Sequence, residues 1–184
     1  MADYEILNTS DAEKWNNLYS NLTEKKQSPF FTSQYYESYL EVEKGKIECF
    51  CCYLDKDNFL FYPYLRREIN SLGYDLPDKF YDIAGAYGYN GPLGKVSDPR
   101  FIDYFNSALK HHLREISVVT EFVRYCPIIN NRIFHTYTNQ IDVLDNVYID
   151  LSKGLEDVWN NSFESKVRNI YRKSEKYNLL TQIY

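Results

Sequence analysis

One group of side chains suited to bind a ligand lies in a glycine-rich stretch between residues 81 and 93, which reads YDIAGAYGYNGPL. Its glycines permit positive φ angles and a close approach of a ligand to the backbone. Tyr87 and Tyr89 stand between them and offer hydroxyl groups and flat ring faces that suit a sugar or a peptide. Tyr87, Tyr89 and Gly91 are therefore candidate binding residues. A tight structural loop at a strand end would give the same pattern, and no Lys-Ser or Lys-Thr pair follows to make a phosphate loop.

A second candidate is Arg124, which stands at the end of an apolar run, shortly before the turn that Pro127 begins. An arginine in this place can hold an anionic group at the mouth of a cleft. The alternative is an ordinary ion pair with a neighbouring Asp or Glu. The position of Arg124 thus points to anion binding, and the pattern leaves both interpretations open.

A third candidate is a basic stretch, residues 165–176, which carries five basic residues and one acidic residue in an acidic protein. On a helix, Arg168, Arg172 and Lys176 would lie on one face because they are four residues apart. Phosphate or pyrophosphate is a natural ligand for such a stripe. Arg168 and Arg172 are therefore candidate anion-binding residues, and a solvated helix face is the alternative.

No nucleophile, catalytic base or metal site is indicated by the sequence. The three histidines form no triad pattern, and no metalloprotease or zinc-finger spacing is present. Cys49, Cys51, Cys52 and Cys126 lack the C-x2-C spacing of metal pairs. We expect them to be buried free thiols, with Cys49 and Cys51 on one face of a strand and Cys52 on the other.

Composition and charge narrow the class of protein. The chain of 184 residues is 44% hydrophobic and 26% charged, which is typical of one globular domain or slightly more. A formal net charge of −5 disfavours direct DNA binding, because such binding depends on neutralising phosphates. No run approaches the roughly 18 to 20 apolar residues of a membrane span, and the acidic start does not resemble a secretory signal. We therefore expect a cytoplasmic protein.

The elements that must position these side chains follow from periodicity and from turn residues. Helices are expected at about 12–24, from Thr32 or Ser33 to Lys44, from Asp98-Pro99 to Glu115, at 155–163 and at 165–177. Strands are expected at 4–7, 47–54, 59–66, 117–125, 133–138, 143–151 and 179–184, with a long irregular loop over 70–97. The fold class is therefore α/β (α+β), with a mixed, mostly antiparallel sheet flanked by helices.

Taken together and in order, several segments resemble the FemAB-like branch of the GNAT acyltransferase superfamily. This branch comprises peptidoglycan-bridge aminoacyltransferases and surface-polysaccharide acyltransferases of bacteria. The segments that carry the resemblance are the helix around Trp15 and the stretches Ser28–Tyr36, Tyr87–Leu93, Glu121–Pro127, Tyr148–Ser152 and Lys166–Lys176.

The resemblance implies two GNAT-like lobes that face each other across a cleft. Residues 1–146 would be the first lobe, and residues 147–184 would be the truncated beginning of the second. The full enzyme would N-acylate a cell-wall precursor or a nucleotide-linked sugar, with acyl-CoA or aminoacyl-tRNA as co-substrate. The pyrophosphate loop of coenzyme A-binding members is not found before Tyr184, so we expect no cofactor to be bound by this chain.

In this interpretation Tyr87 and Tyr89 line the acceptor cleft, and Arg124, Arg168 and Arg172 hold anionic groups of a phosphate-bearing acceptor. The missing second lobe would be a further partner, and the 184-residue chain alone would be inactive. A non-catalytic binding or assembly module that keeps only the acceptor surface is the first alternative. A small-molecule N-acetyltransferase is the second, which the absent coenzyme loop disfavours.

Overall fold

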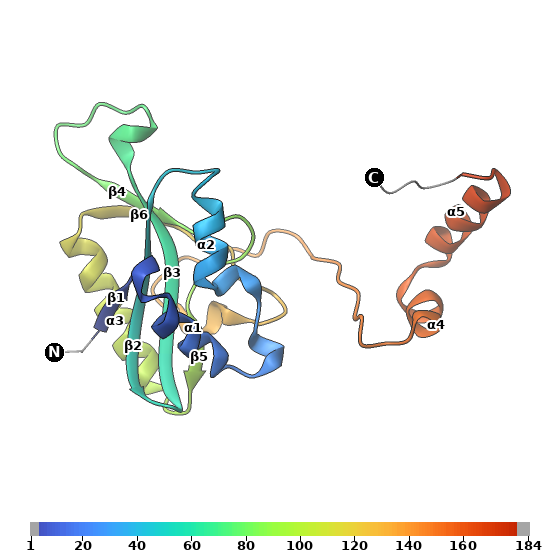
Figure 1. Ribbon diagram of the computed structural model, residues 1–184, viewed down its shortest axis with the longest axis horizontal. Helices are drawn as coiled ribbons and strands as arrows, with labels where there is room; N and C mark the ends of the chain where they lie inside the picture. The colour runs from blue at the N-terminus through green and yellow to red at the C-terminus, as the bar shows by residue number, and fades with distance from the viewer. Residues whose placement is uncertain (1–3, 180–184) are drawn as a thin grey trace. The chain divides into compact units, whose positions relative to one another are not determined.

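The computed structural model describes residues 4–179 (Figure 1). The chain divides into two compact units, Met1–Gln140 and Ile141–Tyr184, and each is described by itself. This division lies close to the boundary expected after residue 146. The interpretation of the two parts as lobes of a transferase stays a prediction.

A mixed sheet forms the centre of the first unit. Within residues 4–140 it has six strands: β1 (Tyr4–Leu7), β2 (Lys46–Asp55), β3 (Asn58–Glu68), β4 (Tyr81–Ala84), β5 (Leu93–Val96) and β6 (Val118–Phe122). Their order is β1-β2-β3-β4-β6, and β5 pairs with the part of β3 that β4 leaves free. All described pairs are antiparallel except β4 with β6, which is parallel. The predicted class, a mixed and mostly antiparallel sheet flanked by helices, is confirmed.

Helices cover both faces of this sheet (Figure 1). On one face α1 (Ala12–Ser20) and α2 (Ser33–Tyr39) bury Trp15 and Tyr36 against strand residues such as Phe61. On the other face α3 (Arg100–Glu115) buries Phe105 among residues that include Tyr62. Each face thus has its own apolar core, and β2 and β3 are buried between the two.

All four cysteines are free and buried, and three of them belong to these two cores. Cys49 and Cys51 lie in the core beneath α1 and α2, whereas Cys52 lies in the core beneath α3. The predicted alternation of the strand faces is confirmed, because successive side chains of a strand point to opposite sides.

Short helical turns complete the first unit. They are the 3-10 turns Thr9–Asp11, Glu24–Lys26, Pro29–Phe31, Ile69–Leu72 and Asn131–Phe134. The predicted strand at 133–138 is therefore wrong. The Asn106 side-chain nitrogen donates to the Phe134 carbonyl at 2.9 Å, and its oxygen accepts from the Thr136 N–H at 3.0 Å. These two backbone groups are therefore already bonded and do not pair with a neighbouring strand.

Other predicted elements are confirmed or shortened. The hairpin of β2 and β3 and the helix α3 lie where they were expected. The first two helices end earlier than predicted, at Ser20 and Tyr39. The stretch 70–97 is not one irregular loop, because it contains β4 and β5.

The second unit contains α4 (Leu155–Asp157), a π-helical turn (Val158–Ser162) and α5 (Ser165–Lys176). The Trp159 ring contacts the rings of Phe163 and Tyr171, with centroids 5.9 Å and 5.0 Å apart. The strand predicted at 143–151 does not form: this segment has no strand structure and most of it is exposed. A strand needs a neighbour to pair its backbone, and no described strand pairs with this segment. The strand predicted at 179–184 lies outside the described residues except for Leu179.

Across residues 4–179, every helix is too short or too polar to cross a membrane.

Candidate functional site

The parallel strands β4 and β6 bring two loops to the same edge of the sheet. Ala84, at the end of β4, lies opposite Phe122, at the end of β6. The glycine-rich loop (residues 85–92) therefore starts beside the segment that carries Arg124. In open sheets with parallel strands, ligands bind outside the carboxyl ends of those strands. This edge is the place where the fold favours a site.

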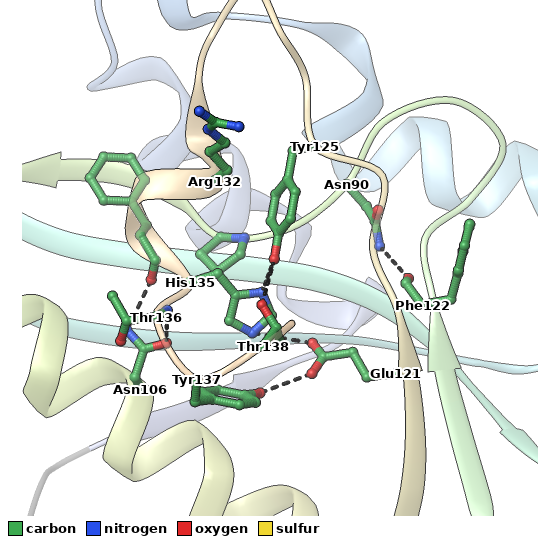
Figure 2. A network of polar contacts seen from close by, with 12 residues as sticks. Asn90, Asn106, Glu121, Phe122, Tyr125, Arg132, His135, Thr136, Tyr137 and Thr138 are labelled. Atoms are coloured by element: carbon green, nitrogen blue, oxygen red, sulfur yellow. Dashed lines mark hydrogen bonds and ion pairs between the residues drawn. The ribbon is translucent and has the colours of Figure 1, made fainter. Parts of the chain in front are cut away.

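Asn90 joins the two loops by three hydrogen bonds. The backbone N–H of Asn90 donates to the Arg124 carbonyl at 2.9 Å, and the N–H of Arg124 donates to the Asn90 side-chain oxygen at 2.7 Å. The side-chain nitrogen of Asn90 donates to the Phe122 carbonyl at 3.3 Å (Figure 2). Because Asn90 is 2% exposed, these bonds are shielded from water and fix the loop against the segment that follows β6.

Asn131 supports the glycine-rich loop from beneath. Its buried side-chain nitrogen donates to the carbonyls of Asn90 and Pro92, at 2.9 Å and 3.1 Å, and its oxygen accepts from the Cys126 N–H at 2.9 Å. Sequence reasoning missed Asn90 and Asn131. The one available signal was an asparagine between glycines, a residue that often bonds to backbone in turns.

Glycine is required at Gly88 and Gly91, because their φ angles are +104° and +100°. A Cβ atom on Gly91 would lie 3.0 Å from the Asn131 side-chain nitrogen and 3.1 Å from the Tyr125 ring. Backbone conformation and close packing are therefore enough to explain why these positions are glycine. The same close packing makes the loop rigid, and a rigid loop is also compatible with ligand binding.

Tyr87, Tyr89 and Arg124 lie around this edge with different surroundings. The Tyr87 side chain is 72% exposed, and its carbonyl accepts a hydrogen bond from the Tyr35 hydroxyl. Tyr89 is half-buried, with its ring edge-to-face against Phe30 at a centroid distance of 5.5 Å. The Arg124 side chain is exposed and makes no ion pair within residues 4–179. The structure thus brings four candidates together: Tyr87, Tyr89, Gly91 and Arg124.

Arg168 and Arg172 belong to the second unit. The Arg168 guanidinium donates to the carbonyls of Asn160 at 3.1 Å and Phe163, so it closes the turn that precedes α5. Arg172 is exposed and donates to the Asn169 side chain at 3.3 Å. Arg168 therefore has a structural role within its unit, and Arg172 is the more accessible of the two.

A buried polar cluster lies under the segment that follows β6 (Figure 2). We define it by the side chains that share it: Tyr62, Glu121, Tyr125, His135, Tyr137 and Thr138. The Tyr137 hydroxyl donates to one Glu121 oxygen at 3.0 Å, and the other Glu121 oxygen is 3.4 Å from His135 Nε2. The Tyr125 hydroxyl lies 2.8 Å from His135 Nδ1 and 3.0 Å from the Thr138 hydroxyl.

Burial controls the protonation of this cluster. Removal from water lowers the pKa of His135 to about 4 and raises the pKa of Glu121, despite the hydrogen bond that the carboxylate accepts from Tyr137. His135 is therefore neutral at pH 7, and its contact with Glu121 is not an ion pair. No sequence pattern predicts this cluster. Five of its members lie within residues 121–138 in a spacing that fits no motif, and the sixth, Tyr62, lies on β3.

Neither the hollow described next nor any metal-ligating cluster of the described residues includes the candidate residues. A hollow of about 630 Å³ lies beside β1 and α1, and Lys14 and Tyr53 are among its lining residues. None of the candidate residues lines it. Over the described range 4–179, no three His, Cys, Asp or Glu side chains lie close enough to hold a metal ion.

Comparison of the chain with protein-family models, with curated proteins and with solved structures found no match. The functional interpretation therefore rests on the geometry above and on the motifs of the sequence. Membership of the FemAB-like branch stays a prediction.

Proposed function

We propose that the first unit is the acceptor-binding lobe of a FemAB-like acyl- or aminoacyltransferase of the GNAT type. The full enzyme would N-acylate a cell-wall precursor or a nucleotide-linked sugar, with acyl-CoA or aminoacyl-tRNA as co-substrate. The observation that carries the proposal is the meeting of the glycine-rich loop with Arg124 at the carboxyl ends of β4 and β6. The mixed, mostly antiparallel sheet flanked by helices agrees with the architecture that the resemblance implies.

The chemistry of this edge suits an acceptor that combines a sugar with phosphate. Tyr87 presents an exposed aromatic face, on which a sugar ring packs well. Arg124 presents a guanidinium that is free to bind phosphate oxygens in a bidentate manner. The buried bonds of Asn90 and Asn131 hold both side chains on a rigid backbone, which reduces the entropy lost on binding.

Such a lobe contributes to catalysis by positioning. An acceptor amine held in one orientation meets the activated acyl group as in an intramolecular reaction, which lowers the barrier without a covalent enzyme intermediate. In the second unit, Arg168 and Arg172 would bind anionic groups of the acceptor. The bonds of Arg168 to carbonyls within its own unit leave Arg172 as the better candidate of the two.

Binding of UDP-N-acetylglucosamine, measured by isothermal titration calorimetry, tests the proposal. Arg124→Ala should raise the dissociation constant about tenfold, the equivalent of about 1.4 kcal/mol, because one charge-assisted contact to phosphate is lost. The matched control is Arg114→Ala, since Arg114 is also exposed but lies on α3. It should leave the dissociation constant unchanged.

Two results would contradict the proposal. One is that the unaltered chain does not bind this nucleotide-linked sugar. The other is that Arg124→Ala and Arg114→Ala weaken binding equally, which would indicate attraction by general charge rather than by a site.

A further inference from the structure

Three buried polar atoms of the cluster make no hydrogen bond to another protein group within residues 4–179. They are the Tyr62 hydroxyl, Glu121 Oε1 and His135 Nε2. Tyr62 and His135 are 0% exposed, and the Glu121 side chain is 11% exposed. A buried polar atom without a partner costs about 1 to 3 kcal/mol. Three such atoms in one place therefore need an explanation beyond packing.

The contacts of the cluster form a continuous path. From Glu121 Oε1 the path runs 3.4 Å to His135 Nε2, crosses the imidazole ring, and continues 2.8 Å from Nδ1 to the Tyr125 hydroxyl. The Tyr125 hydroxyl then lies 3.0 Å from the Thr138 hydroxyl. Tyr125 and Thr138 are half-buried, so the path leads from a buried carboxylate to the surface (Figure 2).

The 3.4 Å contact between Glu121 Oε1 and His135 Nε2 is not a hydrogen bond in the structure. A closer approach of these two atoms would let the path be hydrogen-bonded in two opposite directions. With Glu121 ionised, His135 Nε2–H donates to the carboxylate and the Tyr125 O–H donates to His135 Nδ1. With Glu121 protonated, its O–H donates to Nε2, Nδ1–H donates to the Tyr125 oxygen, and the Tyr125 O–H donates to Thr138. A neutral imidazole serves in both, because it always has one donor and one acceptor nitrogen.

We propose that Glu121, His135, Tyr125 and Thr138 form a proton relay, with Glu121 as the buried site that takes up one proton from the surface. A proton delivered by water to the Tyr125 oxygen is accompanied by transfer of the Tyr125 hydroxyl proton to His135 Nδ1. The proton on His135 Nε2 then passes to Glu121 Oε1. One proton enters and one is bound, and no other group changes its charge.

The surroundings of Glu121 favour this behaviour. Tyr137, which donates to its other oxygen, and Tyr62 stay neutral, since burial and the carboxylate raise the pKa of both phenols. The pKa of Tyr125 is also raised by burial. Lys110 lies with its ammonium over the Tyr137 ring, 6.0 Å from the ring centroid. Within residues 4–179 no lysine or arginine forms an ion pair with Glu121, and burial raises its pKa.

The relay also lies next to the candidate site, and it does not require that site to bind an acceptor. A Cβ atom on Gly91 would lie 3.1 Å from the Tyr125 ring, and Arg124 precedes Tyr125 in the chain. A buried group that exchanges a proton at the surface is the element that general acid–base chemistry requires. The inference stands on the geometry of the cluster alone, so it can hold even if the acceptor proposal fails.

Nitrogen NMR of the chain labelled with ¹⁵N-histidine tests the relay, because it identifies which ring nitrogen carries the hydrogen. His135 should carry its hydrogen on Nε2 at pH 8.5 and on Nδ1 at pH 5. It should not become doubly protonated between these values. The other two histidine signals are identified by their loss in His111→Gln and His112→Gln.

Two variants isolate the ends of the path. Glu121→Gln should abolish the change of tautomer, because the amide does not titrate. Tyr125→Phe should keep the hydrogen on Nε2 at pH 5, because Nδ1–H then lacks an acceptor. The matched control is Tyr53→Phe, since Tyr53 is exposed on β2, and it should leave the change intact. Amide spectra verify that each variant is folded.

The relay is overturned if the same nitrogen of His135 is protonated at both pH values in the unaltered chain. It is equally overturned if both nitrogens become protonated in this range, or if Tyr125→Phe shows the same change as the unaltered chain. These outcomes are independent of sugar-nucleotide binding.

Discussion

Buried asparagine side chains replace backbone pairing at the points where the sheet of the first unit stops. Asn131 uses three of its hydrogen-bonding positions on backbone groups of two different segments. Asn106 does the same for the segment after Phe134. A side-chain amide carries both a donor and an acceptor, so it can satisfy the backbone of a loop that has no neighbouring strand. Asn131, together with Asn90, thereby fixes the geometry of the loops of the candidate site.

Acid should destabilise the protein through His135. Its folded pKa of about 4 lies below the value of about 6.5 in the unfolded chain, so the unfolded state binds more protons between these values. Stability is therefore present above pH 6.5 and falls as the pH decreases towards 4, by about 3 kcal/mol in all. Urea denaturation at pH 7.5, 6 and 5 measures this loss.

His135→Gln is the reference for the change of unfolding free energy with pH. Glu121 is present in this variant and in the unaltered chain, so its contribution, which rises as the pH falls, is the same in both. The variant should lose less stability between pH 7.5 and pH 5 than the unaltered chain. His111→Gln is the control, since His111 is exposed on α3, and its slope should equal that of the unaltered chain. Equal slopes for all three proteins would show that His135 is not buried in neutral form.

Among the helices and strands, the sequence predicts those whose start or turn is determined by neighbouring residues. The turn at 55–58 was enough to predict the hairpin of β2 and β3, and Asp98-Pro99 marked the start of α3. The four-residue strands β4 and β5 are too short for a periodic pattern, so local patterns predict a loop there. The pairing of β4 with β6 depends on contacts between distant segments. Tyr87 and Arg124 could thus be named from the sequence, whereas their junction through Asn90 could not.

Gly91→Ala should destabilise the first unit more than Gly73→Ala. Both glycines have a positive φ angle, +100° and +98°, so either alanine costs about 1 to 2 kcal/mol of backbone strain. A Cβ on Gly73 meets nothing within 4 Å, whereas one on Gly91 meets Asn131 and Tyr125. The resulting overpacking should add about 1 to 3 kcal/mol for Gly91→Ala. Urea denaturation of both variants measures the difference in the free energy of unfolding. Equal decreases would mean that the loop around Gly91 shifts to accommodate the Cβ atom without losing stability.

For the whole molecule, the two units differ in how much apolar surface they bury. Both core clusters lie within Met1–Gln140. In the second unit Val158 is buried, while Leu144, Val147 and Leu151 are each more than 80% exposed. Burial of apolar surface supplies most of the stability of a fold, so the two units should not be equally stable.

Hydrogen exchange should therefore be much faster in α5 than in α3. An isolated helix as short as α5, with 12 residues, is marginal in water, and Ile170 on its apolar face is 59% exposed. We expect its amides to be protected at least about a hundredfold less than those of α3, whose apolar face is buried in the core. Mass spectrometry of peptides from 100–115 and 165–176 measures this ratio. Equal protection would mean that α5 has a stable partner, and Ile170→Ser would then identify its apolar face as the contact by lowering protection in α5 alone.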